Sequence, residues 1–286
     1  MRPAWIAKRT TAALVRHWCP TRKQNTHKGN YGRVLILAGA EGYTGAPALA
    51  ARSSLRSGAG LIYLGVPRAV YPIVAAKLNA PVVFPLPDSD GKLSLDALPE
   101  ILRRLETADA CLLGPGLGRS ETSDALVLEV IRRCKCPLVL DADGINAAAA
   151  HKDVLRGAAC PLILTPHEGE FRRLTDAEET DRILGAEALA NDLGAIILRK
   201  GHETIITNGM MTYVNRTGNA GMATGGSGDA LAGILVSLLG QGVPPMEAAA
   251  TAAWLHGSAG DLAAEDLGQY AMGPEDLIES LSRLLP

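Results

Sequence analysis

The glycine-rich stretch Asn219-Ala-Gly-Met-Ala-Thr-Gly-Gly-Ser-Gly-Asp229 runs directly into the apolar segment Ala230-Leu-Ala-Gly-Ile-Leu-Val-Ser-Leu-Leu239. The apolar segment predicts a buried helix that begins near Asp229. Glycines before such a helix let backbone N–H groups converge, and the positive end of the helix dipole adds to their attraction for an anion. The residues Gly225-Gly-Ser-Gly228 therefore predict a phosphate-sized anion site.

Asp229 stands in the first turn of this predicted helix. We expect the positive end of the helix dipole to hold its carboxylate ionised. An ionised carboxylate beside a bound phosphate can accept a proton from a hydroxyl that attacks phosphorus. For this stretch taken by itself, the alternative is a glycine-rich turn with an ordinary capping aspartate.

Short apolar runs bounded by Gly or Pro alternate with helical patterns before this stretch. Because the runs are almost continuously apolar, they predict strands of a sheet that is covered on both faces. The predicted strands are 34–38, 61–66, 110–113, 138–141, 162–165 and 195–199, and helices between them include 46–57, 122–133 and 178–193. This alternation is typical of an α/β protein with a mostly parallel sheet.

The rhythm breaks once, late in the chain. Thr204–Thr207 and Met211–Val214 flank Asn208-Gly209, which predicts an antiparallel hairpin with a two-residue type I′ turn. Helices at 229–239, 246–264 and 274–285 follow. We therefore expect one αβα sandwich domain over residues 28–286.

Composition limits the possible functions. The 286 residues carry 28 Lys and Arg against 30 Asp and Glu, so the net charge of −2 argues against a cationic nucleic-acid binder. A hydrophobic fraction of 47% excludes a disordered chain. The uncharged stretch 230–246 is broken by Gly and Pro, which argues against a membrane span. Five cysteines indicate reduced thiols and a cytoplasmic location. Cys134-Lys-Cys136 lacks a second ligand pair, so no residue is assigned to a metal.

The N-terminal region is basic. Eight Lys or Arg and no acid precede Glu41, a pattern that an organelle transit peptide would also show. We favour a short helix over Thr11–Trp18 followed by the first loop of the domain, because the basic residues continue to Arg33, next to the first strand. Residues 1–27 are therefore predicted to be an N-terminal helix and lead-in.

Polar or glycine-rich loops follow several of the predicted strands, where open parallel sheets bind their ligands. These loops are 39–45, 114–118, 141–146, 165–170 and 200–204. The GxxxxGK[ST] and GxGxxG patterns are both absent, so a bound nucleotide would place its phosphates on 225–228 instead.

The loops carry a resemblance to a known family. In order they contain Lys28-Gly-Asn-Tyr-Gly-Arg33, Tyr43-Thr-Gly-Ala-Pro47, Ser57-Gly-Ala-Gly-Leu61, Gly114-Pro-Gly-Leu-Gly118, Asp141-Ala-Asp-Gly-Ile-Asn146, Thr165-Pro-His-Glu-Gly-Glu170 and Thr217-Gly-Asn-Ala-Gly-Met-Ala-Thr-Gly-Gly-Ser-Gly-Asp229. From Lys28 to the C-terminus the chain resembles the ADP- or ATP-dependent NAD(P)H-hydrate dehydratases, which have a ribokinase-like fold. The resemblance implies an enzyme that restores NADH and NADPH from their hydrates.

The resemblance also implies roles for individual residues. Asp229 would be the catalytic base and would contact the hydrated nicotinamide. The residues implied to bind the NAD(P)H hydrate beside it are Ala46, Gly116 and His167. Those implied to bind the nucleotide are Lys200, Gly201, His202, Glu203, Thr204, Asn219, Gly225, Gly226, Ser227 and Gly228. His202 and Glu203 depart from the smaller or apolar residues expected there.

The remaining implications concern cofactors and partners. Mg²⁺ and ADP or ATP would supply the phosphoryl group. The family leads us to expect a homo-oligomer, a tetramer, with the epimerase that interconverts the hydrate's epimers on a separate chain. A kinase of a small alcohol, a catalytically silent nucleotide-binding regulator and a nicotinamide dehydrogenase are the alternatives, the last disfavoured by its missing glycine fingerprint.

Overall fold

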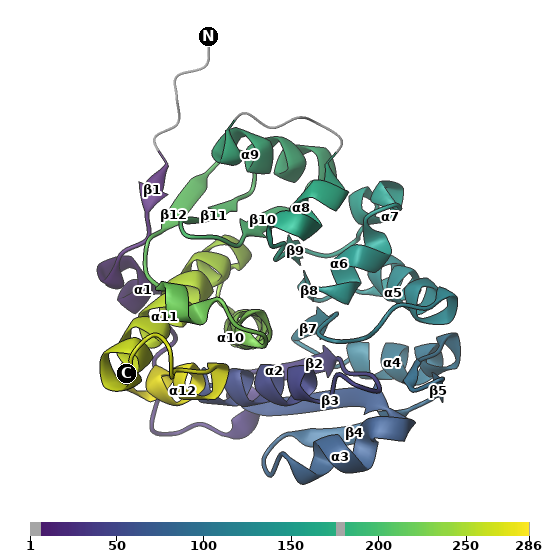
Figure 1. Cartoon of the computed structure of the whole chain (residues 1–286). Helices are drawn as coiled ribbons and strands as arrows, with labels where there is room; N and C mark the ends of the chain where they lie inside the picture. The colour runs from purple at the N-terminus through teal and green to yellow at the C-terminus, as the bar shows by residue number, and fades with distance from the viewer. Residues whose placement is uncertain (1–6, 176–180, 286) are drawn as a thin grey trace.

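The computed structural model describes residues 7–175 and 181–285. A ten-stranded sheet in the order β1-β12-β11-β10-β9-β8-β7-β2-β3-β4 forms its centre (Figure 1). Neighbouring strands pair parallel except β10 with β11 and β11 with β12. The expected mostly parallel sheet with a late antiparallel hairpin is confirmed.

Among the described residues, strands are observed close to every predicted position, together with four that were not predicted. Their bounds are β1 Lys8–Arg9, β2 Arg33–Leu37, β3 Leu61–Pro67, β4 Val82–Leu86, β7 Ala110–Leu113, β8 Leu138–Leu140, β9 Leu162–Leu164, β10 Ile196–Arg199, β11 Thr204–Thr207 and β12 Thr212–Asn215, with a separate two-stranded sheet of β5 Asp88–Ser89 and β6 Lys92–Leu93.

Helices cover both faces of the sheet. Their bounds are α1 Ala12–Trp18, α2 Gly45–Arg56, α3 Tyr71–Ala76, α4 Leu98–Leu105, α5 Glu121–Arg133, α6 Asp143–Ala148, α7 Lys152–Arg156, α8 Glu168–Leu174, α9 Arg182–Leu193, α10 Ser227–Gly240, α11 Pro245–Leu267 and α12 Pro274–Ser280. Short 3₁₀ turns occur at 28–31, 68–70, 95–97, 220–222 and 281–283. Along β2, Val34 and Ile36 join the core under α2, α10 and α11, while Leu35 and Leu37 join the core under α4 and α5. Alternate side chains of one apolar strand thus fill two cores, which explains the continuous hydrophobic pattern.

Helix α10 is central to the fold. Its side chains from Ala230 to Gly240 are buried, and it packs against α2 and α11 (Figure 1). A Cβ at Gly233 would come within 2.2 Å of the Ala50 carbonyl oxygen, so glycine at this position lets α10 and α2 approach closely. This contact fixes the start of α10 relative to the loops at the sheet edge.

The structure corrects the predicted hairpin turn. Thr207 pairs with Thr212, so the loop has four residues, 208–211. A type I′ turn needs positive φ at both central residues, yet only Gly209 of the predicted pair has one, at +83°. The Asn208 side-chain oxygen instead accepts hydrogen bonds from the backbone N–H groups of Met210 and Met211, at 3.0 and 2.8 Å. This side chain holds the longer loop.

Several elements escaped the sequence analysis. Strand β4 contains Pro85, which a strand at the edge of a sheet tolerates. Strand β1 pairs with β12, so the N-terminal segment set apart as a lead-in adds a strand to the main sheet. The predicted helix 178–193 is observed from Arg182, capped by the Asp181 side chain, and its residues 178–180 lie outside the described residues. In the described ranges 7–175 and 181–285, no helix combines the length and apolarity that a membrane crossing requires.

Candidate active site

The carboxyl ends of β8, β9 and β10 place three polar side chains in contact. Lys200, which follows β10, donates from Nζ to Asp141 Oδ1 at 2.9 Å, and the Thr165 hydroxyl donates to the same oxygen at 2.6 Å. Leu140 pairs with Leu164 in the parallel register, so the next residues, Asp141 and Thr165, are adjacent. The sheet itself therefore builds this cluster.

Glu170 extends the cluster towards His167. Its Oε2 lies 3.9 Å from Lys200 Nζ, and its Oε1 lies 3.1 Å from His167 Nε2. His167 is the N-cap of α8, and its Nδ1 accepts from the Gly169 backbone N–H at 3.0 Å. About half of the His167 side chain is exposed, whereas Glu170 is buried. His167 thus presents its ring to solvent at the rim of the cluster.

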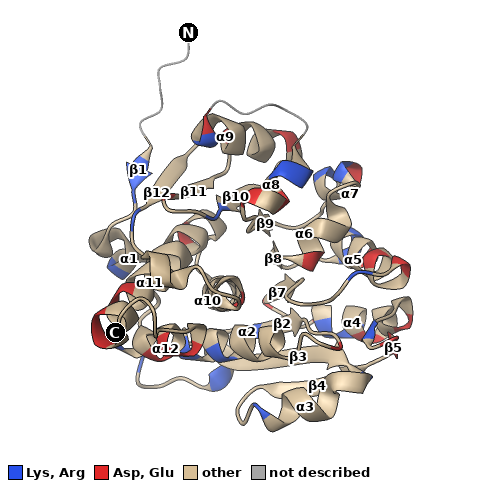
Figure 2. Cartoon of the chain, viewed as in Figure 1, with Lys and Arg blue, Asp and Glu red and all other residues tan. Residues whose placement is uncertain are grey.

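The charge of Lys200 is stabilised in place. Burial disfavours the ammonium form, but Asp141, Glu170 and Asp229 outweigh this effect and raise the pKa of Lys200 above its ordinary value. Burial raises the pKa of Glu170, while the charge of Lys200 opposes that rise. Lys200 therefore carries its positive charge at neutral pH. Figure 2 shows acidic residues on α6 and acidic and basic residues on α8, near the labels of β8, β9 and β10.

The start of α10 forms the predicted glycine loop. Gly226 is the N-cap, with a φ of +94° that favours glycine, and the Ala230 backbone N–H donates to its carbonyl at 3.1 Å. A Cβ at Gly228 would lie 3.4 Å from Lys200 Nζ. Gly228, at the end of this loop, thus lies beside the ammonium of Lys200, an arrangement that suits a phosphate.

His256 fixes this loop from α11. Its Nε2 lies 2.8 Å from the Ser227 carbonyl oxygen and 3.1 Å from the Ser227 hydroxyl. Because a carbonyl only accepts, Nε2 carries the hydrogen and donates it. Burial, together with the charge of Lys200, lowers the pKa of His256 to about 4, although the hydrogen bond to Ser227 opposes this shift. His256 is therefore a neutral donor at physiological pH.

Asp229 was expected to be fully ionised at neutral pH, but its surroundings raise its pKa. Burial raises its pKa to about 7, with further contributions from Asp141 and Asp143, and Lys200 only partly offsets them. The expectation that the helix dipole holds Asp229 ionised is wrong, because loss of solvent and two neighbouring carboxylates outweigh the dipole. A carboxylate with a pKa near 7 is poised to accept and release a proton at neutral pH.

Ala46 and Gly116 lie against each other on the opposite side of the site. A Cβ at Gly116, whose φ is +59°, would come within 3.0 Å of Ala46 Cβ and 2.9 Å of Tyr43 Cβ. Ala46 lies in the first turn of α2, and Leu49 of the same helix touches Gly226. The loops after β2 and β7 are thus brought beside the glycine loop.

The other candidate residues have contacts outside the cluster. Arg182 donates to the carbonyls of Lys200 and Glu203, both at 3.3 Å, and a Cβ at Gly201 would meet the Arg182 guanidinium. The Glu203 side chain pairs with Arg216 at 2.9 Å. Thr204 begins β11 and its hydroxyl donates to the Gly201 carbonyl, while His202 is exposed. Lys200 is the residue of this segment that joins the cluster.

Asn219 shapes its own loop. Its Nδ2 donates to the Gly260 carbonyl at 2.9 Å and to Asp261 Oδ1 at 3.1 Å, and its Oδ1 accepts from the Gly221 backbone N–H at 2.9 Å. These bonds tie the stretch before the glycine loop to α11.

Sequence reasoning missed Asp141, Glu170 and His256 as site residues. Asp141 and Glu170 stand in two of the family motifs found in the sequence, and their place in these motifs could have indicated that they belong to the site. Asp143, which stands in the same loop as Asp141, accepts from the Gly118 backbone N–H at 2.9 Å and acts on Asp229. Ala142, between Asp141 and Asp143, has a positive φ of 46°, an unusual backbone conformation for a residue other than glycine. His256 gives no local signal within its alanine-rich helix.

Taken together, the fold and the site define a ribokinase-like α/β protein. At one edge of its sheet lie a glycine loop suited to a phosphate, a lysine, and an aspartate whose pKa is raised. A sequence model described as NAD(P)H-hydrate dehydratase matches residues 34–283. The chain belongs to this family, which confirms the resemblance drawn from the motifs.

Two relatives and one solved structure show the extent of the similarity. The bifunctional NAD(P)H-hydrate repair enzyme Nnr of Moorella thermoacetica is 46% identical over 96% of this chain and 53% of its own length. The ADP-dependent (S)-NAD(P)H-hydrate dehydratase of Neisseria meningitidis serogroup B is 35% identical over 90% of this chain and 86% of its own. The ADP/ATP-dependent NAD(P)H-hydrate dehydratase of Bacillus subtilis, co-crystallised with ATP/Mg²⁺, superposes with a TM-score of 0.84, 29% identity and 98% coverage of both chains. The chain spans about half the length of the bifunctional relatives it matches.

Proposed function

We propose that this protein dehydrates the hydrates of NADH and NADPH at the expense of ADP or ATP, and thereby restores the reduced nicotinamide cofactors. The observation that carries the proposal is that Asp229, with its pKa of about 7, directly follows the glycine loop and interacts with Lys200, whose ammonium lies beside Gly228. The relatives' names supply the substrate class: one is an ADP-dependent dehydratase and another was crystallised with ATP/Mg²⁺.

The reaction must convert a hydroxyl, a poor leaving group, into a good one. Asp229 takes the hydroxyl proton as the substrate oxygen attacks the terminal phosphorus of the nucleotide, and the bond from that phosphorus to the bridging oxygen breaks. AMP or ADP is released. Phosphate then leaves from the nicotinamide ring as the ring nitrogen donates its electron pair, and loss of a ring proton restores the double bond.

The remaining residues position the two substrates. We assign the phosphates to the amides of Gly225–Gly228 and to Lys200, which together stabilise the charge that develops on the transferred group. The hydrated nicotinamide lies between Asp229 and the rim formed by Ala46, Gly116 and His167. In this assignment Gly201 to Thr204 and Asn219 shape the nucleotide side of the site.

The donor set fits a magnesium ion that enters with the nucleotide. Asp143 adds to the rise that burial causes in the pKa of Asp229, and carboxylate oxygens are ligands that Mg²⁺ prefers. In the part of the chain that the structure describes, no group of three or more His, Cys, Asp or Glu is arranged to hold a metal ion. Asp143 and Asp229 would therefore share the ion with phosphate oxygens. When bound, Mg²⁺ neutralises phosphate charge.

Two simultaneous measurements test the function. The purified protein, given a hydrate preparation with ADP or ATP, is expected to release phosphate and to regain the near-ultraviolet absorbance of reduced nicotinamide in equal amounts. Nucleotide consumption with a stable phosphorylated product would instead identify a kinase. Nucleotide binding without consumption would identify a regulator.

The cytoplasmic location, the homotetramer and the separate epimerase chain belong to the same proposal. The name of the Moorella relative states two functions, and this chain matches about half of that protein. A hydrate preparation enriched in one epimer tests the last point, because this chain alone should leave the other epimer unconverted.

A further inference from the structure

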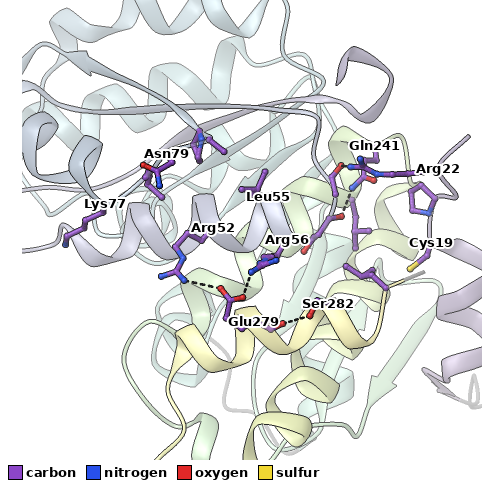
Figure 3. Close-up of a pocket in the computed structure, with 18 residues that line it drawn as sticks. Cys19, Arg22, Arg52, Leu55, Arg56, Lys77, Asn79, Gln241, Glu279 and Ser282 are labelled. Carbon is purple, nitrogen blue, oxygen red and sulfur yellow. Dashed lines mark hydrogen bonds and ion pairs between the residues drawn. The ribbon is translucent and has the colours of Figure 1, made fainter. Parts of the chain in front are cut away.

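A cavity lies beside α2, and its arginine-lined part is at the far end of that helix from the candidate active site. Its volume is about 640 Å³, and it lies between α2, the end of α10 and α12 (Figure 3). Helix α2 carries Ala46 in its first turn and Arg56 as its last residue, so at about 1.5 Å per residue these two residues lie roughly 15 Å apart. The arginine-lined part of the cavity is therefore separate from the cluster around Asp229, whereas Lys77 lies towards Thr44 at the start of α2.

The lining of this cavity is strongly basic. Four cationic side chains, Arg22, Arg52, Arg56 and Lys77, line it together with a single carboxylate, Glu279. Arg52 lies 3.2 Å from Glu279, and Arg56 pairs with the same carboxylate (Figure 3). One negative charge is thus shared between two guanidinium groups.

The other two cations have uncharged partners. Arg22 Nη2 donates to the Gly58 carbonyl at 2.9 Å, and its guanidinium lies 4.3 Å from the centre of the Tyr31 ring. Lys77 Nζ donates to the Thr44 hydroxyl at 3.0 Å. These contacts orient the two side chains and leave their charges to attract an anion.

The rest of the lining mixes polar and apolar side chains. Its apolar part includes Leu55, Leu78, Pro81, Leu238 and Leu285. Pockets that bind small molecules measure about 300–1,000 Å³ and combine an apolar wall with a few polar groups, so the size and chemistry here fit an organic ligand. Arginine forks are suited to phosphate, which they bind through paired hydrogen bonds.

We propose that this cavity binds a phosphorylated small molecule. Its phosphate takes the place of the Glu279 carboxylate on Arg52 and Arg56, and its organic part lies against the leucine wall. The site needs neither the glycine loop nor Asp229, so it stands or falls independently of the proposed dehydration.

Calorimetric titration with phenyl phosphate tests the proposal. In the double variant Arg52→Gln/Arg56→Gln we expect the affinity to fall about tenfold or more. The matched control is Arg132→Gln/Arg133→Gln, because these two arginines share Glu129 in the same way, each at 2.9 Å, but do not line the cavity. The control should bind as the wild type does. Phenyl phosphate binding that is unchanged in Arg52→Gln/Arg56→Gln is assigned to the glycine loop. If all of the binding is unchanged in this variant, the proposal is wrong.

Two further arms separate a binding site from a merely structural ion pair. Glu279→Gln removes the competing carboxylate and should tighten phenyl phosphate binding, a gain that structural damage does not produce. Inorganic phosphate should bind more weakly than phenyl phosphate, since it lacks an apolar part. Weaker binding in Glu279→Gln, or equal affinity for the two probes, contradicts the proposal. So does a change of oligomeric state in Arg52→Gln/Arg56→Gln by light scattering, which would assign these arginines to a subunit contact.

Discussion

Lys200 Nζ lies 2.9 Å from Asp141 Oδ1 and points to the first turn of α10. The two residues follow β10 and β8, which are separated in the sheet by β9, so the contact depends on the register of three parallel strands. It fixes one positive charge among Asp141, Glu170 and Asp229. The pKa of Asp229 therefore depends on its burial first and then on the charges at this sheet edge.

The first prediction concerns the pH dependence of turnover and its control by Lys200. Because Asp229 acts as a base with a pKa of about 7, kcat/KM of the wild type should rise with pH and level off above that value. Lys200 lowers the pKa of Asp229, so Lys200→Met should move the midpoint upward by about one pH unit or more. Lys200→Arg, which keeps the charge, is the control. An unchanged midpoint in Lys200→Met would show that Asp229 does not govern the profile.

The second prediction is that Asp229→Asn loses activity and gains stability. Removal of a general base costs about 10²- to 10⁴-fold in kcat, while the glycine loop should retain the nucleotide. The pKa of Asp229 is raised from 3.8 to about 7 on folding, so the wild type loses stability as pH rises across that range. Asparagine carries no charge, and the melting temperature of Asp229→Asn should therefore exceed that of the wild type more at pH 8 than at pH 5.

Thermal unfolding at the two pH values measures this gain. Glu265→Gln, at an exposed carboxylate of α11, is the control and should show no such pH dependence. A stability difference that is the same at pH 5 and pH 8 would mean that folding does not raise the pKa of Asp229, which would contradict the prediction.

The glycine loop and the central helix were predictable because their signals are local. Gly225 to Gly228 followed by an apolar decapeptide indicates an anion loop and a buried helix without reference to the rest of the chain. Contacts across the sheet gave no such signal. Asp141 and Lys200 are 59 residues apart, and the strand register alone brings them together.

The predictions that were wrong or missing also depend on contacts that the local sequence does not reveal. The pKa of Asp229 depends on its burial and on the charge of Asp141. Neither can be inferred from the sequence of the helix that carries Asp229. The predicted type I′ turn at Asn208 was wrong because the Asn208 side-chain oxygen accepts hydrogen bonds from two backbone N–H groups of a longer loop. His256 is 29 residues from Ser227 and lies on a helix whose small residues predict only close packing.

The third prediction assigns His256 a positioning role. Its Nε2–H holds the Ser227 carbonyl at the start of α10, and loss of such a buried hydrogen bond costs about 1–3 kcal/mol. His256→Ala should therefore raise the nucleotide KM by about tenfold. With its own pKa near 4, His256 is neutral above pH 5, so the pH midpoint of kcat/KM should stay at that of Asp229. His256→Asn, which keeps an N–H donor, should recover part of the loss. A shifted midpoint would instead assign His256 to proton transfer.

The fourth prediction separates the two adjacent glycines of the loop. Gly226 has a φ of +94°, and a Cβ there would come within 2.5 Å of Leu49 Cδ1 and 3.1 Å of Pro274 Cγ. Gly226→Ala should cost about 1–2 kcal/mol from the backbone alone, with the displacement of Leu49 in addition. We expect a melting temperature lower by several degrees. Gly225→Ala is the matched control, because a Cβ at Gly225 meets no atom within 4 Å and its φ is not in the positive range. Thermal unfolding without nucleotide compares the two variants, and equal losses would show that α2 and α12 do not enclose Gly226.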